Sequence, residues 1–218
     1  MNLVYGILGM IGGLCCAVGE ILLDMKGKDN QKLGAYGIMN SNWEKMGMWR
    51  FQASILMVSI GVPLYFLGLT SLANQLVTDH PLFGLFFWVI SMVGSVGVFF
   101  IHVMICLMPI TYKRMLHKQD IGAIERVMNA MYEAIRLPYL VMYVLLSGVT
   151  SLMIVLSIFN GYISLSPYFI LGTPLSLMLI GAILQKLKPE LFYDLPRIVM
   201  LSLGLGMIGC MAVLNLLS

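Results

Sequence analysis

Charged side chains are absent from long stretches of this chain. Only 11% of the 218 residues are Asp, Glu, Lys or Arg, whereas 60% are hydrophobic. No charge occurs in residues 1–19, 51–78, 137–185 or 198–218, and only His102 interrupts 81–112. The longest remaining connection, 109–137, is too short for an independent soluble fold. The sequence therefore predicts a single integral membrane domain over residues 1–218.

Motifs that hold metals or cofactors are missing as well. The four cysteines lie in apolar stretches at spacings that match no zinc or redox motif, and they are Cys15, Cys16, Cys106 and Cys210. Glu20, Asp24 and His102 could supply three metal ligands, but there is no HExxH and no His pair at helical spacing. We therefore predict no metal and no cofactor.

Other protein classes are excluded by further absences. No basic residue precedes the first apolar stretch, so we interpret it as a membrane helix and not as a cleaved signal peptide. No Lys lies inside an apolar stretch, which excludes a retinal-type Schiff base. The net charge of +3 needs no nucleic-acid partner, because membrane topology and attraction to anionic headgroups explain the basic residues.

The apolar stretches are long enough for six membrane helices. Crossing about 30 Å of hydrocarbon takes about 20 helical residues. The run 137–185 must hold two helices, with a turn at Asn160-Gly161-Tyr162 between them. We predict an all-α bundle with spans at roughly 3–25, 51–75, 82–108, 138–159, 167–185 and 197–217.

The basic residues predict how the bundle is oriented. All thirteen fall into the first, third and fifth connections between spans, and they are Lys26, Lys28, Lys32, Lys45, Arg50, Lys113, Arg114, Lys118, Arg126, Arg136, Lys186, Lys188 and Arg197. By the positive-inside rule these connections are cytoplasmic, so both termini face outward. The expected location is the bacterial inner membrane, with membrane lipids as partners.

Two cytoplasmic segments carry signals of local structure. An amphipathic helix is predicted over 121–136, with Asp120 as its N-cap and Pro138 limiting its far end. It would lie on the inner leaflet or cover the mouth of the bundle. In the first connection, Ser41 and Glu44 form a capping-box pattern, which predicts that helix two begins near residue 42. We expect the neighbouring Trp43 and Trp49 to anchor the chain at the headgroups.

Glycine and proline inside the spans predict how the helices pack. Gly9 and Gly13 form a GxxxG pair that lets helices approach closely, and the same role is expected for Gly12, Gly94, Gly97, Gly204, Gly206 and Gly209. Pro63 and Pro174 predict kinks inside the second and fifth spans.

A layer of polar residues is expected toward the cytoplasmic side. Glu20 lies about 9 Å below Lys26 on helix one, and His102 lies about 10 Å inward from Pro109 on helix three. The same measure places Tyr143, Ser54 and Ser202 about 6 to 10 Å inside their spans. An unpaired carboxylate in hydrocarbon costs several kcal/mol, so Glu20 should face the interior and meet a donor, with His102 the nearest by depth.

These residues form the predicted site. Glu20 would be a general base or proton carrier, His102 its acid partner or orienting group, and Tyr143 a hydrogen-bond donor. Asp24, Arg50, Ser54 and Ser202 are the predicted substrate-binding residues, with Arg50 placed to bind a phosphate headgroup. Alternatively, the acid and the imidazole only hold two helices together.

The pattern Gly19-Glu20-x-x-x-Asp24, followed by Asn40-Ser41-Asn42-Trp43 and by Arg50 before a Tyr65-containing span, resembles small six-helix membrane proteins of uncharacterised bacterial families. The resemblance covers chiefly the first third of the chain. It implies a bacterial inner-membrane origin, and it implies no reaction, substrate or catalytic residue.

Two function classes fit these observations. In the first, the bundle is an enzyme or receptor that admits a lipid or another amphiphilic small molecule laterally. In the second, it is a transporter in which Glu20 carries a proton or a cation. The first is favoured because carriers usually place their sites near the midplane between repeated halves, whereas these ionisable residues lie off-centre. The sequence leaves the oligomeric state open.

Overall fold

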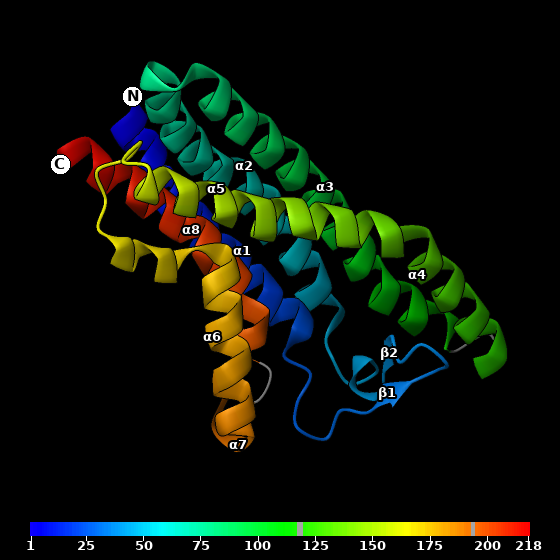
Figure 1. Ribbon diagram of the computed structural model, residues 1–218. Helices are drawn as coiled ribbons and strands as arrows, with labels where there is room; N and C mark the ends of the chain where they lie inside the picture. The colour runs from blue at the N-terminus through cyan, green and yellow to red at the C-terminus, as the bar shows by residue number, and fades with distance from the viewer. Residues whose placement is uncertain (117–119, 193–194) are drawn as a thin grey trace.

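The computed structural model describes residues 1–116, 120–192 and 195–218, excluding the side chains of 191–198. Within these residues the fold is all-α apart from one short hairpin (Figure 1). Five helical segments are long and apolar enough to cross a membrane: Asn2–Asp24, Met48–Asp79, Pro81–Met115, Ile121–Phe159 and Val199–Leu217. These helices fit a multi-pass membrane protein. Lys118 and the Arg197 side chain, which we placed in the basic connections, lie outside the described residues.

The fifth predicted span is divided in two. Residues 167–172 form the 3-10 helix η3 (Pro167–Gly172), and the α-helix α6 (Pro174–Leu187) follows. Thr173 between them is extended, with φ −68° and ψ 152°, as expected for a residue before proline. Pro174 therefore begins a helix, and the predicted kink within one continuous span is wrong.

Helix α1 (Asn2–Asp24) is packed between α2 (Met48–Asp79) and α8 (Leu195–Leu217) through glycine. A Cβ added to Gly13 would lie 2.5 Å from the Cα of Gly206, and one added to Gly9 would lie 3.0 Å from the amide nitrogen of Gly68. The backbones therefore touch where side chains would keep them apart. The predicted close approach at these glycines is confirmed.

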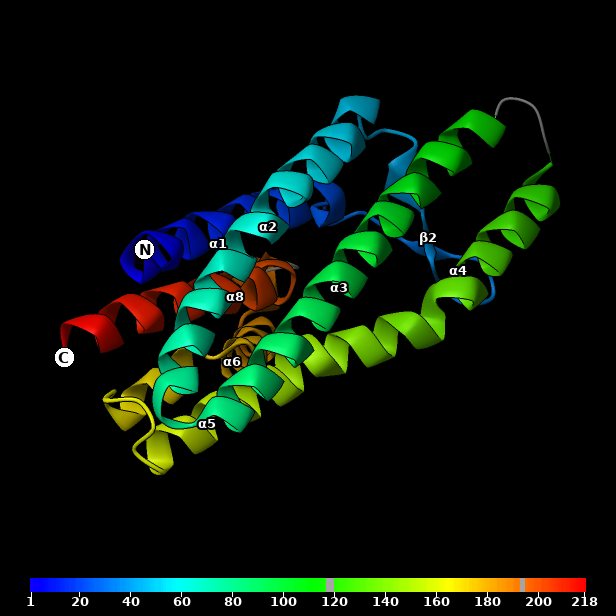
Figure 2. The same ribbon diagram turned by 90° about the horizontal axis from the view of Figure 1, so that it is seen from above.

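One long helical segment runs from Ile121 to Phe159, and Figure 2 shows it crossing beside α3 (Pro81–Met115). It consists of α4 (Ile121–Tyr143), the π-helical stretch η2 (Val144–Val149) and α5 (Thr150–Phe159). Asp120 caps its start as predicted, because its Oδ1 accepts a hydrogen bond from Ala123 N at 2.5 Å. Pro138, however, does not end the helix. Proline removes one backbone donor, and long membrane helices tolerate that loss.

The first basic connection folds against the ends of α3 and α4. It contains the hairpin of β1 (Lys32–Leu33) and β2 (Met39–Asn40) and the 3-10 turn η1 (Ser41–Trp43), and α2 then begins at Met48 with Gly47 as its N-cap. The capping box does not form, and the predicted start near 42 is wrong. Trp43 is buried edge-on against Tyr112, so its predicted role as an interfacial anchor is wrong too.

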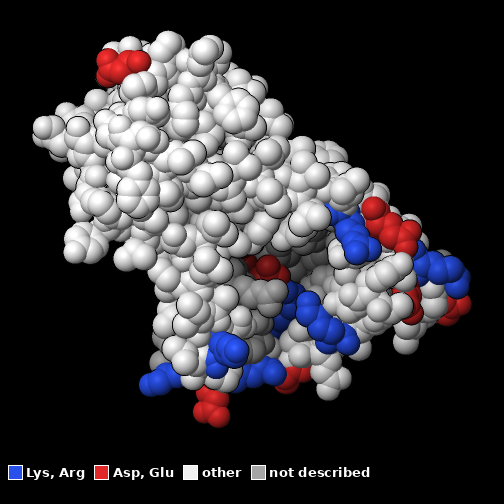
Figure 3. Space-filling model, viewed as in Figure 1, with Lys and Arg blue, Asp and Glu red and all other residues white. Residues whose placement is uncertain are grey.

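The two ends of the bundle differ in charge. Both termini lie at one end together with the α2–α3 turn (Figure 1). The visible Lys and Arg side chains gather at the opposite end, which we call the basic end (Figure 3). The short helix α7 (Pro189–Phe192) also lies at the basic end, beyond α6. The surface is hollowed between α4 and the α6–α7 arm, and both acidic and basic side chains are visible in the hollow.

Candidate functional site

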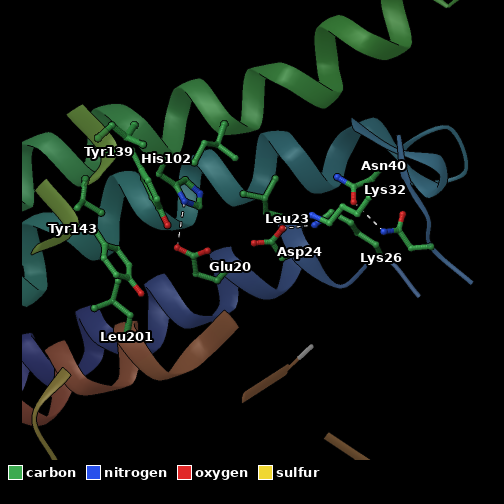
Figure 4. Close-up of a pocket in the computed structure, with 14 residues that line it drawn as sticks. Glu20, Leu23, Asp24, Lys26, Lys32, Asn40, His102, Tyr139, Tyr143 and Leu201 are labelled. Atoms are coloured by element: carbon green, nitrogen blue, oxygen red, sulfur yellow. Dashed lines mark hydrogen bonds and ion pairs between the residues drawn. The ribbon is translucent and has the colours of Figure 1, made fainter. Parts of the chain in front are cut away.

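A cavity of about 470 Å³ opens toward the basic end. Three helices and the first connection supply most of its wall, and α8 adds Leu201. Its lining consists of Glu20, Leu23, Asp24, Lys26, Asn30, Lys32, Asn40, Val98, Ile101, His102, Ile105, Tyr139, Tyr143 and Leu201. Figure 4 shows apolar and tyrosine side chains around its deeper part and lysine and asparagine side chains near the hairpin.

Glu20 and His102 meet in the wall of this cavity. Oε1 of Glu20 lies 3.4 Å from Nδ1 of His102 (Figure 4). The imidazole is buried, with 5% of its side chain exposed, whereas 25% of the Glu20 side chain is exposed. The carboxylate is thus accessible from the cavity, and the buried imidazole contacts it from the protein interior.

Ser54 holds the other nitrogen of the imidazole. Its Oγ lies 3.0 Å from His102 Nε2 and 2.7 Å from the carbonyl oxygen of Gly19. Gly19 allows this contact, because a Cβ there would lie 2.7 Å from Val58 Cγ2 and would push α1 away from α2. Sequence reasoning placed Ser54 at the correct depth, and the structure gives it the imidazole as a partner.

The hydrogen bonds around Ser54 constrain the tautomer of His102. A carbonyl oxygen only accepts, so the Ser54 hydroxyl must donate to Gly19 O, and its oxygen then accepts from His102 Nε2–H. A neutral imidazole with its proton on Nε2 would turn a bare lone pair toward Glu20. The pair is satisfied only if one further proton lies between His102 Nδ1 and Glu20 Oε1. Glu20 and His102 are therefore placed to share one proton.

Helix α4 contributes two tyrosines to the cavity. Tyr139 and Tyr143 are one helical turn apart with ring centroids 5.5 Å apart, and the Tyr139 hydroxyl points toward the Glu20–His102 pair (Figure 4). Tyr143 Oη donates to Sδ of Met178 on α6 at 3.3 Å. Sequence reasoning found Tyr143 and missed Tyr139, although their four-residue spacing predicts a common face.

Side chains of the first connection surround the mouth of the cavity. Lys26 forms a hydrogen-bonded ion pair with Asp24, and Asn30 Nδ2 donates to Asn40 Oδ1 at 2.9 Å. Lys32, on β1, is exposed. Sequence reasoning missed the lysines and the asparagines as lining residues, because the hairpin that folds them back over α1 has no strong sequence signal.

The first connection is attached to α4 at the basic end. Ala35 N donates to Glu125 Oε1 at 2.7 Å, and Tyr36 Oη donates to Glu133 Oε1 at 2.9 Å. The second bond raises the pKa of the Tyr36 hydroxyl, because the hydroxyl must keep its proton to donate to the carboxylate. The bonds from Lys45 and Asn42 lower the pKa of Asp29. These contacts hold the mouth of the cavity in place.

The other predicted site residues are distributed as follows. Ser202 lines a smaller second cavity, whose wall also includes Glu20 and His102. Arg50 does not line either cavity: its Nη2 donates to the carbonyl oxygens of Met25 at 2.9 Å and Ile21 at 3.3 Å. The guanidinium thus satisfies carbonyls at the C-terminus of α1. Over the described part of the chain, no three His, Cys, Asp or Glu side chains group as metal ligands would.

Comparisons with known proteins leave the function open. No curated protein matches the chain, and no solved structure matches it. The family of unknown function DUF6796 matches it over residues 1–218, which is its whole length. The chain belongs to this family.

Proposed function

We propose that this membrane protein binds or processes a lipid-like or other amphiphilic small molecule in the cavity at its basic end. The observation that carries the proposal is the combination of a 470 Å³ cavity with the Glu20–His102 pair in its wall. Intramembrane ionisable residues that face a cavity are typical of functional sites. Residues that serve only helix packing have no need of a cavity beside them.

The lining favours an amphiphile over a wholly polar molecule. Val98, Ile105 and Leu201 offer an apolar surface to an acyl chain, and Lys32 and Asn40 near the mouth offer polar groups to a headgroup. The hollow between α4 and the α6–α7 arm provides a lateral route into the cavity. By the positive-inside rule the basic end is cytoplasmic, so the ligand would come from the inner leaflet.

The chemistry proposed for the site is proton transfer. Glu20 and His102 are placed to share one proton, and the carboxylate is the partner that the cavity exposes. Glu20 would therefore accept or release a proton next to a bound ligand while Ser54 keeps the imidazole in position. Tyr139 and Tyr143 would donate hydrogen bonds to the polar part of the ligand.

A second candidate function is proton-coupled transport. The contact between Glu20 and His102 favours it, because a coupled carrier needs a pair of groups that can hold and release one proton. In that case the same cavity would be the vestibule of the carrier on the basic side.

Native mass spectrometry of gently purified protein tests the proposal. We expect a co-purified amphiphile that is retained by the wild type and lost from Glu20→Gln, because the substitution removes the ionisable proton and retains the side-chain size. The matched control is Glu44→Gln, at an exposed carboxylate that lines neither cavity. Equal retention by the wild type and Glu20→Gln would contradict the binding proposal.

Proteoliposomes separate the two candidates. Under the transport candidate, an imposed pH gradient should drive flux that Glu20→Gln abolishes and Glu44→Gln does not. If the amphiphile is retained but no pH-driven flux occurs, the binding proposal stands and the transport candidate is excluded.

A further inference from the structure

A second, much smaller cavity lies on the inner side of the Glu20–His102 pair. Its volume is about 20 Å³, and its wall includes Cys16, Val58, Val62, Tyr65, Leu205 and Ser202. It shares Glu20, His102, Val98 and Leu201 with the large cavity. Cys16 precedes Glu20 by about one helical turn on α1, so this cavity lies about one turn farther from the basic end.

The Tyr65 hydroxyl in this wall lacks a hydrogen-bond partner. Tyr65 is 1% exposed, and its Oη is among the buried polar atoms that no described protein group satisfies. Ser95 on α3 donates its own proton to Ser91 O at 2.6 Å and could only accept from Tyr65, but the two hydroxyls do not come within hydrogen-bond geometry. A buried hydroxyl without a partner costs about 1–3 kcal/mol, so native proteins usually satisfy such a group with ordered water.

The small cavity meets the physical requirements of a water site. A cavity needs roughly 10–15 Å³ to hold one water molecule, and the water needs two to four polar partners. The volume of about 20 Å³ is sufficient, and the residues of the wall that carry oxygen in their side chains are Glu20, Tyr65 and Ser202. Val58, Val62 and Leu205 add apolar groups to the same wall.

We propose that the small cavity holds one buried water molecule, which links the Tyr65 hydroxyl to the Glu20–His102 pair. The pair then lies between two hydrated spaces, with the ligand cavity on one side and the buried water on the other. The Glu20 carboxyl group would then have the buried water as a hydrogen-bond partner even when a ligand fills the large cavity. The inference does not rest on the proposed ligand, because it concerns the opposite side of the pair.

X-ray hydroxyl-radical footprinting of the intact protein in lipid nanodiscs tests the water directly. Radiolysis of a bound water produces a radical beside the side chains that hold it, so buried residues at that water become oxidised. We expect oxidation of Tyr65 and none of Phe87, which is fully buried and lines neither cavity. Tyr65 protected as fully as Phe87 would overturn the proposal.

A variant that fills the cavity provides the matched comparison. Val62→Ile adds one methylene to the wall, which should displace the water and abolish oxidation of Tyr65. Val93→Ile makes the same change at a site that is 39% exposed and lines neither cavity, and it should leave the labelling intact. Labelling that persists in Val62→Ile would overturn the proposal. The labelling should be the same in sodium and in choline salts. Labelling that changes between the two would also overturn the proposal, because it would indicate a bound cation in place of water.

The sign of a stability change gives an independent test. If water satisfies the hydroxyl, Tyr65→Phe loses a hydrogen bond and its Tm should fall. If the cavity is dry, the same change removes an unsatisfied group and the Tm should rise. We expect a fall in the wild-type background and a rise in the Val62→Ile background. A rise or no change in the wild-type background would overturn the proposal.

Discussion

The helices α1 and α6 are both apolar, yet they pack in opposite ways. Eight α1 residues are buried, five of them glycines, and the backbones of α2 and α8 touch them directly. In α6, Pro174 and Gly181 are the buried residues, and Leu175, Leu179, Ile183 and Leu187 are exposed. Glycine contacts along its whole length therefore distinguish α1 from α6, which makes one such contact, at Pro174 against Gly204 of α8, and touches α4 and α5 through Met178 and Leu175.

This difference gives the candidate site two unlike walls. Glu20, Ser54 and His102 lie on α1, α2 and α3, where close backbone contacts determine their positions. On the opposite side, Tyr143 of α4 reaches α6 through a hydroxyl–thioether contact with Met178. Regions with few buried apolar contacts open at lower free-energy cost than the core does. The Glu20–His102 pair thus lies on the fixed wall, and we call the opposite wall, which α4 supplies and α6 supports through Met178, the adjustable wall.

Substitutions on the fixed wall should cause the largest loss of stability. Gly13→Ala places a methyl group 2.5 Å from the Gly206 Cα, and backbone cannot move aside as a side chain can. We expect destabilisation of about 3 kcal/mol, the upper end of overpacking costs, with reduced yield of folded protein. Thermal unfolding in detergent measures it.

The control for this change is Gly148→Ala in η2, where the nearest atom to the added methyl group is 3.9 Å away. It should leave the Tm within error or raise it slightly, since alanine favours helix. Equal destabilisation by the two substitutions would show that loss of glycine, not close packing, causes the effect.

Ser54→Ala should have the next largest effect. The change removes the acceptor of His102 Nε2–H and leaves that buried group without a partner, whereas Gly19 O keeps its backbone hydrogen bond within α1. We expect a loss of about 1–3 kcal/mol and weaker retention of the co-purified amphiphile. Ser59→Ala is the matched control, because its Oγ bonds only to Ile55 O of its own helix, four residues back. Equal retention by the two variants would mean that Ser54 does not position the imidazole.

Changes on the adjustable wall should affect the ligand more than the fold. Tyr143→Phe removes the contact with Met178 Sδ, and a thioether is a weak acceptor, so the stability loss should be below about 1 kcal/mol. Retention of the amphiphile should nevertheless decrease, as native mass spectrometry would detect. Tyr168→Phe, at a side chain that is 83% exposed, is the control. A stability loss comparable to that of Gly13→Ala would show that α6 is as firmly packed as α1.

The smallest effect is expected at the mouth of the cavity. Lys45 and Asn42 lower the pKa of Asp29, so these contacts contribute stability above the ordinary Asp pKa and lose it as the pH falls through the lowered pKa. Limited proteolysis of residues 26–47 should therefore increase only at strongly acidic pH in the wild type, and Asp29→Asn should remove that dependence. An unchanged acid dependence in Asp29→Asn would assign it to another group.

Hydropathy and charge predicted where the helices lie, but not how each is turned. The spans around residues 3–25, 51–75 and 82–108 follow from lengths of apolar sequence, which the thickness of a bilayer imposes. Depth along these spans also placed Glu20 and His102 within reach of one another. The bonds of Ser54 and Arg50 depend on rotation about the helix axes, and packing against neighbouring helices sets that rotation.

The first connection was the hardest part to predict. Ser41 and Glu44 match a capping box, yet the backbone there forms a 3-10 turn because Asn42 bonds to Lys26 O and Asp29 Oδ1 across the loop. Trp43 follows Asn42 into the interior beside Tyr112. Contacts between residues more than ten positions apart determine this fold, and a local pattern cannot contain them.

The π-helical stretch η2 begins directly after Tyr143 and sets the phase of α4 relative to α5. A π-turn accommodates one more residue than an α-turn does, and each residue rotates an α-helix by about 100°. Deleting a single residue from Val144–Val149 would therefore swing the faces of α4 by about a quarter of a circle and carry Tyr139 and Tyr143 away from the Glu20–His102 pair. A one-residue insertion in the helical ladder thus determines which side chains of α4 the ligand would meet.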